Sequence, residues 1–403
     1  NKTNKINKPN KTIDDNEFMY YPEISDSNFL KKIYLKKEFN KNIIPIEKKS
    51  MEAICDRSEY KLLPQQEFLR NYISIDTPYN GILIIHGTGV GKTCSAISIA
   101  EGFKETLKHS NKRVLVILGR SIKDNFRKEI YSVEREVNKK REDDIVQCTG
   151  TTYELAGNVK HLTAEQRDKK IRQLINESYE FVGYEKFAND VEKKTGWKGD
   201  INNISKASKE IISRDYSNRV IVIDEIQNIK TSDEILQRKV QQILMAVVKF
   251  SKNIRLVLMS ATPMFNKSNE IIYILNLLLL NDGRELINQK DIFYNNGDLK
   301  KGANEILSNA SKGYISYLRG EKPTTFPLRF YPDISYTPKL EYNLTGKNLD
   351  DSLKLKYAKL INIPMSSLQY GKYLQILNKN NNKNNKNNKN NKNNKNNKNN
   401  KNN

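Results

Sequence analysis

Short apolar runs alternate with amphipathic stretches through the middle of the chain. Five runs are rich in β-branched residues and apolar on both faces: "GILIIHG" from Gly81, "RVLVILG" from Arg113, "YEFVGY" from Tyr179, "RVIVIDE" from Arg219 and "IRLVLMSAT" from Ile254. Strands of this kind belong to a parallel sheet that helices cover on both faces. The pattern therefore predicts a doubly wound α/β architecture.

Helical periodicity fills the stretches between and after these runs. The predicted helices are Thr93 to Leu107, Ser121 to Val133, Asp233 to Phe250 and Ser268 to Leu280. Another helix is predicted to begin at the capping-box pattern "TAEQ" from Thr163. The longest apolar stretch, "IIYILNLLLL", is shorter than the roughly 18 to 20 residues of a membrane span. We therefore expect a buried helix there and no membrane partner.

The two ends of the chain have almost nothing apolar to bury. Residues 378–403 are a near-perfect three-residue repeat of Asn and Lys, and residues 1–12 are similar, so both are predicted to be disordered tails. Between them we expect an N-terminal extension over 13–60, a nucleotide-binding domain over 61–285, and a linker with the partial start of a second domain over 286–377. The first residue is Asn rather than Met, which indicates a processed or incomplete chain.

The net charge of the chain is positive and bears on whether the protein binds nucleic acid. The formal net charge is +22 and the pI is near 9.5, a balance that is typical of nucleic-acid-binding proteins. Eight lysines in 378–403 and four in 1–11 supply twelve of those charges, which leaves +10 for the rest. Lys, Asn and Ile dominate throughout, and an AT-rich genome alone could produce this bias. The charge thus permits nucleic-acid binding without requiring it.

The number and spacing of the cysteines bear on whether the protein resides in a reducing or an oxidising compartment. Cys55, Cys94 and Cys148 are too few and too scattered for a disulfide framework. No charged-then-apolar leader with a small-residue cleavage site opens the chain. Both observations predict a reducing, intracellular compartment.

The segment "GTGVGKT" leaves a predicted strand and opens a predicted helix, which is the context of a phosphate loop. Its glycines let backbone N–H groups approach phosphate oxygens at a helix N-terminus, which favours anions. Lys92 is expected to reach the β- and γ-phosphates, and the Thr93 hydroxyl to ligate Mg²⁺. The alternative is a glycine-rich turn with a surface lysine.

His86 stands where the usual phosphate-loop pattern has its first glycine. The later glycines make the close approach, so this position tolerates other residues, and we expect a neutral structural side chain rather than a catalyst. The candidate ATP-binding residues of the loop are His86, Gly87, Thr88, Gly89, Val90, Gly91, Lys92 and Thr93.

A second candidate segment is "VIVIDEIQNIK", in which two acids end a buried strand. Ligands bind at this rim of such sheets. Asp224 is predicted to hold Mg²⁺ through water, and Glu225 to polarise the water that attacks the γ-phosphate. Alternatively, two adjacent acids are simply solvated on a loop. The acidic box comprises Asp224, Glu225, Ile226 and Gln227.

The next strand end carries "LMSATPMFN". Ser260, Ala261 and Thr262 are candidates for coupling, because their hydroxyls can bridge the nucleotide site to a neighbouring domain. The alternative is an ST-turn before Pro263.

The ordered set "LLPQQ", "HGTGVGKT", "DEIQ" and "SATP" resembles superfamily 2 helicases and translocases, in particular the Swi/Snf-like branch. "TPYNGILIIHGTGVGKTCSA", "FVGYEKF", "LMSATPMFN" and "GYISYLRGEKPTTFP" are similar to helicase-like proteins of large nucleocytoplasmic DNA viruses. That group includes the poxvirus early transcription factor small subunit and nucleoside triphosphatase I. The resemblance covers about Lys61 to Pro332 and implies a RecA-like domain.

It also implies an ATP hydrolase of helicase type that uses ATP and Mg²⁺. Lys92, Asp224 and Glu225 would be its catalytic residues, and Gln66 matches the upstream glutamine that reads adenine. The implied partners are DNA or RNA and a viral transcription complex, and the implied location is the virion or host cytoplasm. Gln227 stands where relatives more often have His, which puts in doubt the coupling between γ-phosphate and motion rather than the hydrolysis.

The segment "GRSIKDNFRKEI" resembles the part of such proteins that touches the nucleic-acid backbone. Lys123, Asn125 and Arg127 are its candidate contacts. An exposed amphipathic helix without that role is the alternative.

Motors of this superfamily need a second such domain, whose arginines can be worth about 10³ to 10⁵ in rate. After "YLRGEKPTTFPLRFYP" we find no Q-x-x-G-R-x-x-R-like stretch. The chain is then a fragment, the product of a truncated gene, or a subunit that a partner completes. Two functions stay open: an ATP-dependent helicase or translocase in viral transcription, and a nucleotide-binding transcription-complex subunit without independent turnover.

Overall fold

The computed structural model describes residues 20–43, 61–87, 89–139, 147–198, 201–229, 234–264, 268–318, 348, 350 and 365–376. Contacts divide the chain into two units, 1–326 and 327–403. In the second unit a helix spans 367–376 with exposed side chains. The predicted tails, Thr88 and the stretch after Leu318 that was searched for a second domain lie mostly or wholly outside the described residues.

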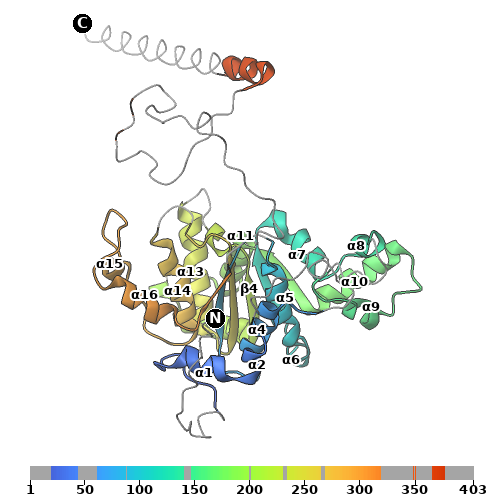
Figure 1. The fold of residues 1–403 in the computed structure, drawn as a ribbon, viewed down its shortest axis with the longest axis horizontal. Helices are drawn as coiled ribbons and strands as arrows, with labels where there is room; N and C mark the ends of the chain where they lie inside the picture. The colour runs from blue at the N-terminus through green and yellow to red at the C-terminus, as the bar shows by residue number, and fades with distance from the viewer. Residues whose placement is uncertain are drawn as a thin grey trace, which may run out of the picture. The chain divides into compact units, whose positions relative to one another are not determined.

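A six-stranded parallel sheet forms the centre of the first unit (Figure 1). Its strand order is β3-β2-β4-β5-β1-β6. The strands are β1 (Gly81–His86), β2 (Val114–Leu118), β3 (Tyr179–Gly183), β4 (Arg219–Ile223), β5 (Ile254–Ser260) and β6 (Ile315–Leu318). The five predicted strands and the α/β class are confirmed.

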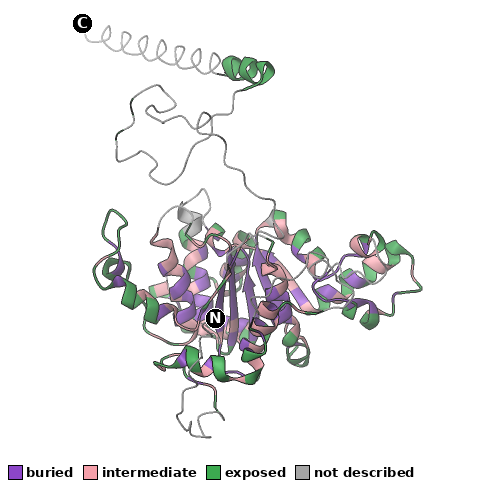
Figure 2. Ribbon diagram, in the orientation of Figure 1, coloured by how far each residue is buried: buried purple, intermediate pink, exposed green. Residues whose placement is uncertain are grey.

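Residues of β1 to β5 are divided between two separate hydrophobic clusters, one on each face of the sheet, and these strands are largely buried (Figure 2). Ile84 and Val116 pack with side chains of α4, α5, α7 and α10. Leu83 and Leu115 pack with side chains of α11, α12, α13 and α14. This arrangement explains why the strands are apolar at consecutive positions, since both of their faces are buried.

Each of the five predicted helices has a counterpart in the structure with shifted bounds, and the other helices were not predicted. The helices of the first unit are α1 (Phe29–Leu35), α2 (Lys37–Asn40), α4 (Pro64–Tyr72), α5 (Lys92–Gly102), α6 (Lys104–His109), α7 (Lys123–Ile130), α8 (Val133–Val137), α9 (Thr152–Gly157), α10 (Ala164–Ser178), α11 (Tyr184–Thr195), α12 (Lys206–Tyr216), α13 (Glu234–Phe250), α14 (Glu270–Asn281), α15 (Gln289–Ile292) and α16 (Ala303–Ser311). Short 3₁₀ turns are η2 (Arg120–Ile122), η3 (Ile201–Asn203) and η4 (Ile226–Ile229). The helix predicted from Thr93 divides at Phe103, and the one predicted to reach Val133 ends at Ile130.

The capping box before α10 is confirmed. Thr163 Oγ1 accepts a hydrogen bond from the Gln166 N–H at 3.3 Å, and Gln166 Oε1 accepts one from the Thr163 N–H at 3.2 Å. The apolar stretch from Ile271 forms α14, which is largely buried. Among the described residues, no helix combines the length and the apolar character that crossing a membrane requires.

The unpredicted strand β6 pairs with β1 and completes one edge of the sheet. It has four residues, and their side chains are exposed or only half-buried, so it lacks the apolar run that marks the other strands. Its residues lie within 286–377, the range predicted to be linker and partial second domain. The domain boundary at 285 stays a prediction, but the sheet itself extends to Leu318.

One disulfide was not expected from the spacing of the cysteines. Cys94 and Cys148 form a disulfide with their Cα atoms 5.1 Å apart, although 54 positions separate them in the sequence. Spacing could not reveal this contact, because the fold brings the first turn of α5 next to the segment that precedes α9.

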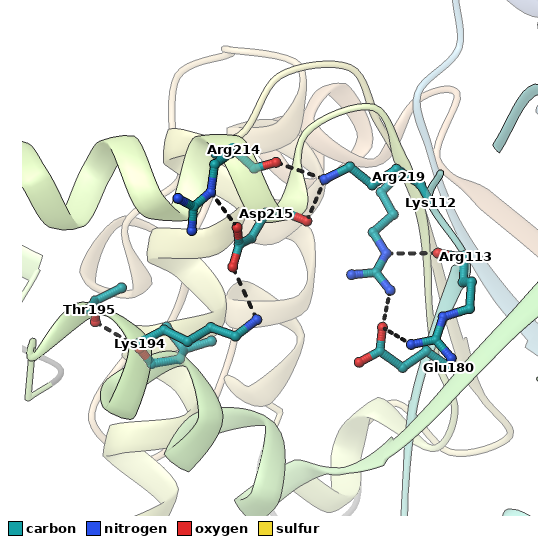
Figure 3. Close-up of polar contacts among 9 residues, drawn as sticks. Lys112, Arg113, Glu180, Lys194, Thr195, Arg214, Asp215 and Arg219 are labelled. Atoms are coloured by element: carbon teal, nitrogen blue, oxygen red, sulfur yellow. Dashed lines mark hydrogen bonds and ion pairs between the residues drawn. The ribbon is translucent and has the colours of Figure 1, made fainter. Parts of the chain in front are cut away.

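Ion pairs and hydrogen bonds connect residues at the amino-terminal ends of the strands (Figure 3). Arg219, the first residue of β4, pairs with Glu180 of β3, and its Nε donates to the Arg113 carbonyl at 2.7 Å. Lys112 Nζ donates to the carbonyls of Arg214 and Asp215 at 2.7 and 3.1 Å. These carbonyls lie in the last turn of α12, where a cation also favours the helix dipole. The network links the amino-terminal ends of β2, β3 and β4 to one another and to α12.

Candidate nucleotide site

The phosphate loop lies between β1 and α5. Gly89 and Gly91 have φ of 78° and 82°, in the left-handed region that glycine occupies without strain. Gly91 is the N-cap of α5, and a Cβ atom there would lie 2.5 Å from Gln66 Nε2. Lys92 and Thr93 are the first two residues of α5 and are partly buried. The loop thus presents backbone N–H groups and a lysine at a helix N-terminus.

Two glutamines of α4 support this loop from the side. Gln65 Nε2 donates to the Val90 carbonyl at 3.2 Å, and Gln66 Nε2 donates to the Gly91 carbonyl at 3.4 Å. Gln66 Oε1 accepts from the Leu63 N–H at 3.0 Å and caps the start of α4. Reading of adenine by Gln66 stays a prediction. Gln65 is an additional contact that the motif did not single out.

His86 ends β1 as a fully buried side chain. Its Nε2 lies 2.9 Å from Ser316 Oγ on β6, and the next N–H, of Gly87, donates to the Leu318 carbonyl at 3.0 Å. Burial, with a smaller contribution from Lys92, lowers the pKa of His86 to about 4. The imidazole is therefore neutral at pH 7 and connects the start of the loop to β6.

Lys92 and Glu225 meet at the carboxyl edge of the sheet, 133 positions apart in the sequence. Lys92 Nζ lies 2.5 Å from Glu225 Oε1, and Gln227 Nε2 donates to Glu225 Oε2 at 2.6 Å. Burial raises the pKa of Glu225, but the hydrogen bonds from Lys92 and Gln227 outweigh it, so the net pKa is lowered. Glu225 is consequently a carboxylate at neutral pH.

Asp224 is buried beside this pair, with 8% of its surface exposed. Burial raises its pKa to about 6, although Lys92 partly opposes the shift. Within the described part of the chain, its Oδ1 is buried without a hydrogen-bond partner. A buried, unpartnered carboxylate oxygen beside Lys92 and Glu225 suits a hard cation such as Mg²⁺, which prefers oxygen ligands. The residues present therefore fit the implied metal.

Glu225 adopts a left-handed backbone conformation with φ of 51°. For a residue other than glycine, such a conformation costs about 1 to 3 kcal/mol and persists only where its surroundings hold it. Tyr184 supplies one restraint, because its hydroxyl donates to the Asp224 carbonyl and lies 3.2 Å from the Glu225 carbonyl oxygen. Burial, then the charges of Asp224 and Glu225, raise the pKa of Tyr184, so its hydroxyl stays protonated.

Tyr184 was quoted in "FVGYEKF" but was given no role from the sequence. The available signal was its place directly after β3, at the edge of the sheet where ligands bind.

The coupling candidates follow β5 next to the acidic box. Ser260 is fully buried, and its Oγ accepts from the Thr262 N–H at 3.0 Å, as in an ST-turn. The Ala261 N–H hydrogen-bonds the Glu225 carboxylate and lowers its pKa. The segment therefore touches the acidic box through its backbone, while the exposed Thr262 faces outward. Ile226, in the acidic box, is buried.

The three nucleic-acid candidates lie on α7. Asn125 is exposed and Lys123 is half-buried. The Arg127 guanidinium lies over the Phe181 ring at 5.2 Å, and its Nη1 donates to Asp124 at 3.4 Å. Arg127 is thus used in packing, which leaves Lys123 and Asn125 as the more accessible pair. Their contact with nucleic acid stays a prediction.

Comparison with known proteins finds one matching domain family and several relatives named as helicases. The chain matches the SNF2-related domain over residues 64–402. Two relatives from Acanthamoeba polyphaga mimivirus, each named "Putative ATP-dependent RNA helicase", are 31% and 30% identical over 77% and 76% of this chain. A "Putative helicase" of Frog virus 3 is 29% identical over 64% of it. The chain spans 28%, 49% and 24% of these relatives, about half their length or less.

Proposed function

The chain belongs to the SNF2-related domain family of helicase-type ATPases, and from that premise we propose that it hydrolyses ATP to move along DNA or RNA as a helicase or translocase. The observation that carries this proposal is the meeting of Lys92, Asp224 and Glu225 at one edge of the sheet. Lysine and carboxylates at these positions serve phosphoryl transfer rather than simple nucleotide storage.

The phosphate chain would lie on the N–H groups of Gly87, Gly89 and Gly91. Lys92 would bind the β- and γ-phosphates, since its ammonium already lies where the loop and the acidic box meet. Thr93 and Asp224 would hold Mg²⁺, which when bound neutralises charge on the phosphate oxygens. For this role Asp224 must be ionised, which its pKa of about 6 allows at neutral pH.

Glu225 would position the attacking water. It is a carboxylate at neutral pH, and its oxygens accept hydrogen bonds from Lys92, Gln227 and the Ala261 N–H. A restrained carboxylate can accept a hydrogen bond from water in only a few directions, which favours in-line attack. The same contact with Ala261 gives the segment after β5 a path to respond to the nucleotide.

Nucleic acid would bind through its backbone. The net charge of +22 and the accessible Lys123 and Asn125 support contact with phosphates rather than with base edges. Binding should therefore be independent of sequence and should weaken steeply with salt. The retention of binding after deletion of 378–403 is expected, because +10 of the charge lies outside both tails. Complete loss would assign the binding to the tail.

A role in viral transcription is the finer part of the proposal. It rests on the resemblance to the poxvirus early transcription factor small subunit and on relatives from viruses. A viral transcription complex would be the partner, and the virion or host cytoplasm the location.

The test is phosphate release measured with and without DNA or RNA. Lys92→Ala should lose ATP binding and release together, whereas Glu225→Gln should bind ATP and fail to release phosphate. Lys239→Ala is the matched control, because it removes an ion pair of similar exposure, with Glu192, away from the site. Release that survives in both site variants would contradict the proposal.

One observation favours the second candidate, a nucleotide-binding subunit without independent turnover. Both carboxylate oxygens of Glu225 have partners within the chain, Lys92 and Gln227. If these contacts persist with ATP bound, Lys92 stays on Glu225 instead of binding the phosphates, and fewer acceptor positions of the Glu225 carboxylate are left for water. ATP binding without phosphate release in the wild type, and release gained in Gln227→His, would support this candidate.

A further inference from the structure

Cys94 and Cys148 connect two functional parts of the domain. Cys94 directly follows Thr93 in the first turn of α5. The segment that holds Cys148 is bonded to the end of α7, because the Cys148 N–H donates to the Glu129 carbonyl at 2.9 Å. Thr149 Oγ1 also donates to the Ile130 carbonyl at 2.7 Å. The disulfide thus joins the phosphate-loop helix to a segment that is hydrogen-bonded to α7, the helix that carries the expected nucleic-acid contacts.

The two sulfur atoms have different surroundings. Cys148 is buried, with 5% of its surface exposed, whereas Cys94 is only partly buried. Glu129 Oε2 lies 3.8 Å from Cys148 Sγ, where it can accept a hydrogen bond from the thiol. The Cα distance of 5.1 Å lies within the range that a disulfide spans without backbone movement. We therefore expect an oxidant to react first with the more exposed Cys94. Cys148 lies next to the Glu129 carboxylate, which can accept its proton.

We propose that Cys94 and Cys148 form a reversible oxidation site for peroxide, and that its disulfide state disconnects ATP hydrolysis from stimulation by nucleic acid. The second clause rests on the function proposed above, whereas the first does not.

The chemistry balances with one peroxide and two thiols. The Cys94 thiolate attacks a peroxide oxygen, the O–O bond breaks, and a sulfenic acid and hydroxide form. The Cys148 thiol gives its proton to Glu129, its sulfur attacks the Cys94 sulfur, and hydroxide leaves. Two thiols are oxidised, hydrogen peroxide is reduced to two water molecules, and the protons released end on the hydroxides. A dithiol reverses the reaction by exchange.

The location of the Cys94–Cys148 disulfide explains why we expect it to affect the coupling to nucleic acid. The phosphate loop, Lys92 and Glu225 have the geometry described above with the disulfide formed, so ATP binding and basal hydrolysis are compatible with it. Transmission from α7 to α5 requires that the two helices change their relative position, because allosteric coupling needs two arrangements of a connecting element. A covalent bond between the first turn of α5 and the segment that is hydrogen-bonded to the end of α7 opposes such a change.

The experiment uses the full chain in a Cys55→Ser background, which leaves one pair of thiols. The protein is reduced with a dithiol, treated with hydrogen peroxide and quenched, with a chelator throughout. The chelator is needed because Cys94, Cys148 and Glu129 offer ligand atoms within 4.8 Å of one another, which suits zinc. Thiols are titrated, the cross-linked peptide is identified by mass spectrometry, and phosphate release is measured with and without nucleic acid.

We expect the reduced protein to contain two titratable thiols, the peroxide-treated protein to contain none, and treatment with a dithiol to restore both. Oxidation should lower the nucleic-acid-stimulated increment by about fivefold or more, the lower end of usual coupling, with little change in basal release. Cys94→Ser and Cys148→Ser should give no cross-linked peptide after peroxide, and their nucleic-acid-stimulated phosphate release should not fall; if either fails to fold, comparison of the two redox states of the parent protein still decides. Thiols that persist after peroxide overturn the oxidation site whatever the ATPase does. A disulfide that forms without lowering the stimulated increment overturns its control of the motor, and absence of any hydrolysis in the reduced protein instead overturns the proposed function.

Discussion

The hydroxyl of Tyr184 donates a hydrogen bond to the backbone carbonyl of Asp224, from the end of β3 to the end of β4. β2 lies between these two strands in the sheet, so the side chain crosses the end of a neighbouring strand to reach the acidic box. It holds the peptide between the expected magnesium ligand and a glutamate in a left-handed conformation. Tyr184 is therefore a positioning residue for the turn that places both carboxylates.

Tyr184→Phe removes this restraint and keeps the ring. Loss of one hydrogen bond of about 1 to 1.5 kcal/mol should let the Glu225 turn relax, and kcat for ATP should fall about tenfold. KM for ATP should change little, because the phosphate loop is untouched. Steady-state phosphate release at several ATP concentrations separates the two constants.

Tyr79→Phe is the matched control for that variant. Tyr79 is a buried tyrosine whose hydroxyl, like that of Tyr184, donates to a backbone carbonyl, that of Pro22 at 2.9 Å. Both variants should lose similar stability, and only Tyr184→Phe should lose turnover. Equal kcat in the two would mean that Tyr184 only supports the fold.

Gly91→Ala should separate the backbone conformation of the loop from its packing. An alanine at φ of 82° costs about 1 to 2 kcal/mol, and its Cβ would also displace the Gln66 side chain, whose Nε2 lies 2.5 Å away. We expect ATP affinity to fall about tenfold or more, because Gln66 holds the carbonyl at the helix N-cap. Fluorescent-nucleotide titration measures this loss.

Gly196→Ala is the control for the backbone cost alone. Gly196 ends α11 with φ of 68°, and a Cβ there would meet nothing within 4 Å. Thermal unfolding should show that both variants are destabilised, while the Gly196 variant binds ATP normally. Unchanged affinity in Gly91→Ala would show that the loop adapts to the clash.

The sheet could be predicted because its strands are buried on both faces. Leu83 and Ile84 enter opposite clusters, so the chain must be apolar at both positions, and this run is visible without any tertiary information. β6 could not be found in this way, since Tyr317 on it is 67% exposed and the strand is held by pairing with β1. The pattern of apolar residues along the chain indicates which positions are buried. An edge strand with exposed side chains lacks such a pattern.

The site was predictable where chemistry follows a strand end. Lys92 and Asp224 were identified because each follows an apolar run and carries a residue type that phosphate or magnesium needs, and the parallel sheet then brings the strand ends together. Tyr184 and Cys148 could not be assigned, because their contacts depend on which strands are neighbours and on where a long insertion returns. The order of the strands in the sequence does not reveal their order in the sheet. The contact between Tyr184 and Asp224 therefore could not be predicted from it.

His86 makes the stability of the domain depend on pH with a known sign. Its pKa is about 4 in the folded chain and 6.5 as the ordinary value, because burial disfavours the charged imidazole. Between these values the unfolded chain binds a proton that the folded chain does not, so stability is lost as pH falls from about 6.5 to 4. From pH 7 to pH 5 this group should remove about 2 kcal/mol from the free energy of unfolding.

Asp224 acts in the opposite direction, so the wild-type profile alone cannot isolate His86. Its pKa is raised from 3.8 to about 6, which means that the folded chain binds the extra proton and gains stability as pH falls through 6. His86→Gln keeps a polar group near Ser316 Oγ and does not titrate. The difference in unfolding free energy between wild type and this variant, measured by denaturant titration at several pH values, should therefore shift against the wild type below pH 6.5. His109→Gln, which removes an exposed imidazole, controls for the loss of a histidine. A difference that stays flat between pH 7 and pH 5 would mean that His86 is not kept neutral by burial, and that its bond to β6 must be explained by a charged ring.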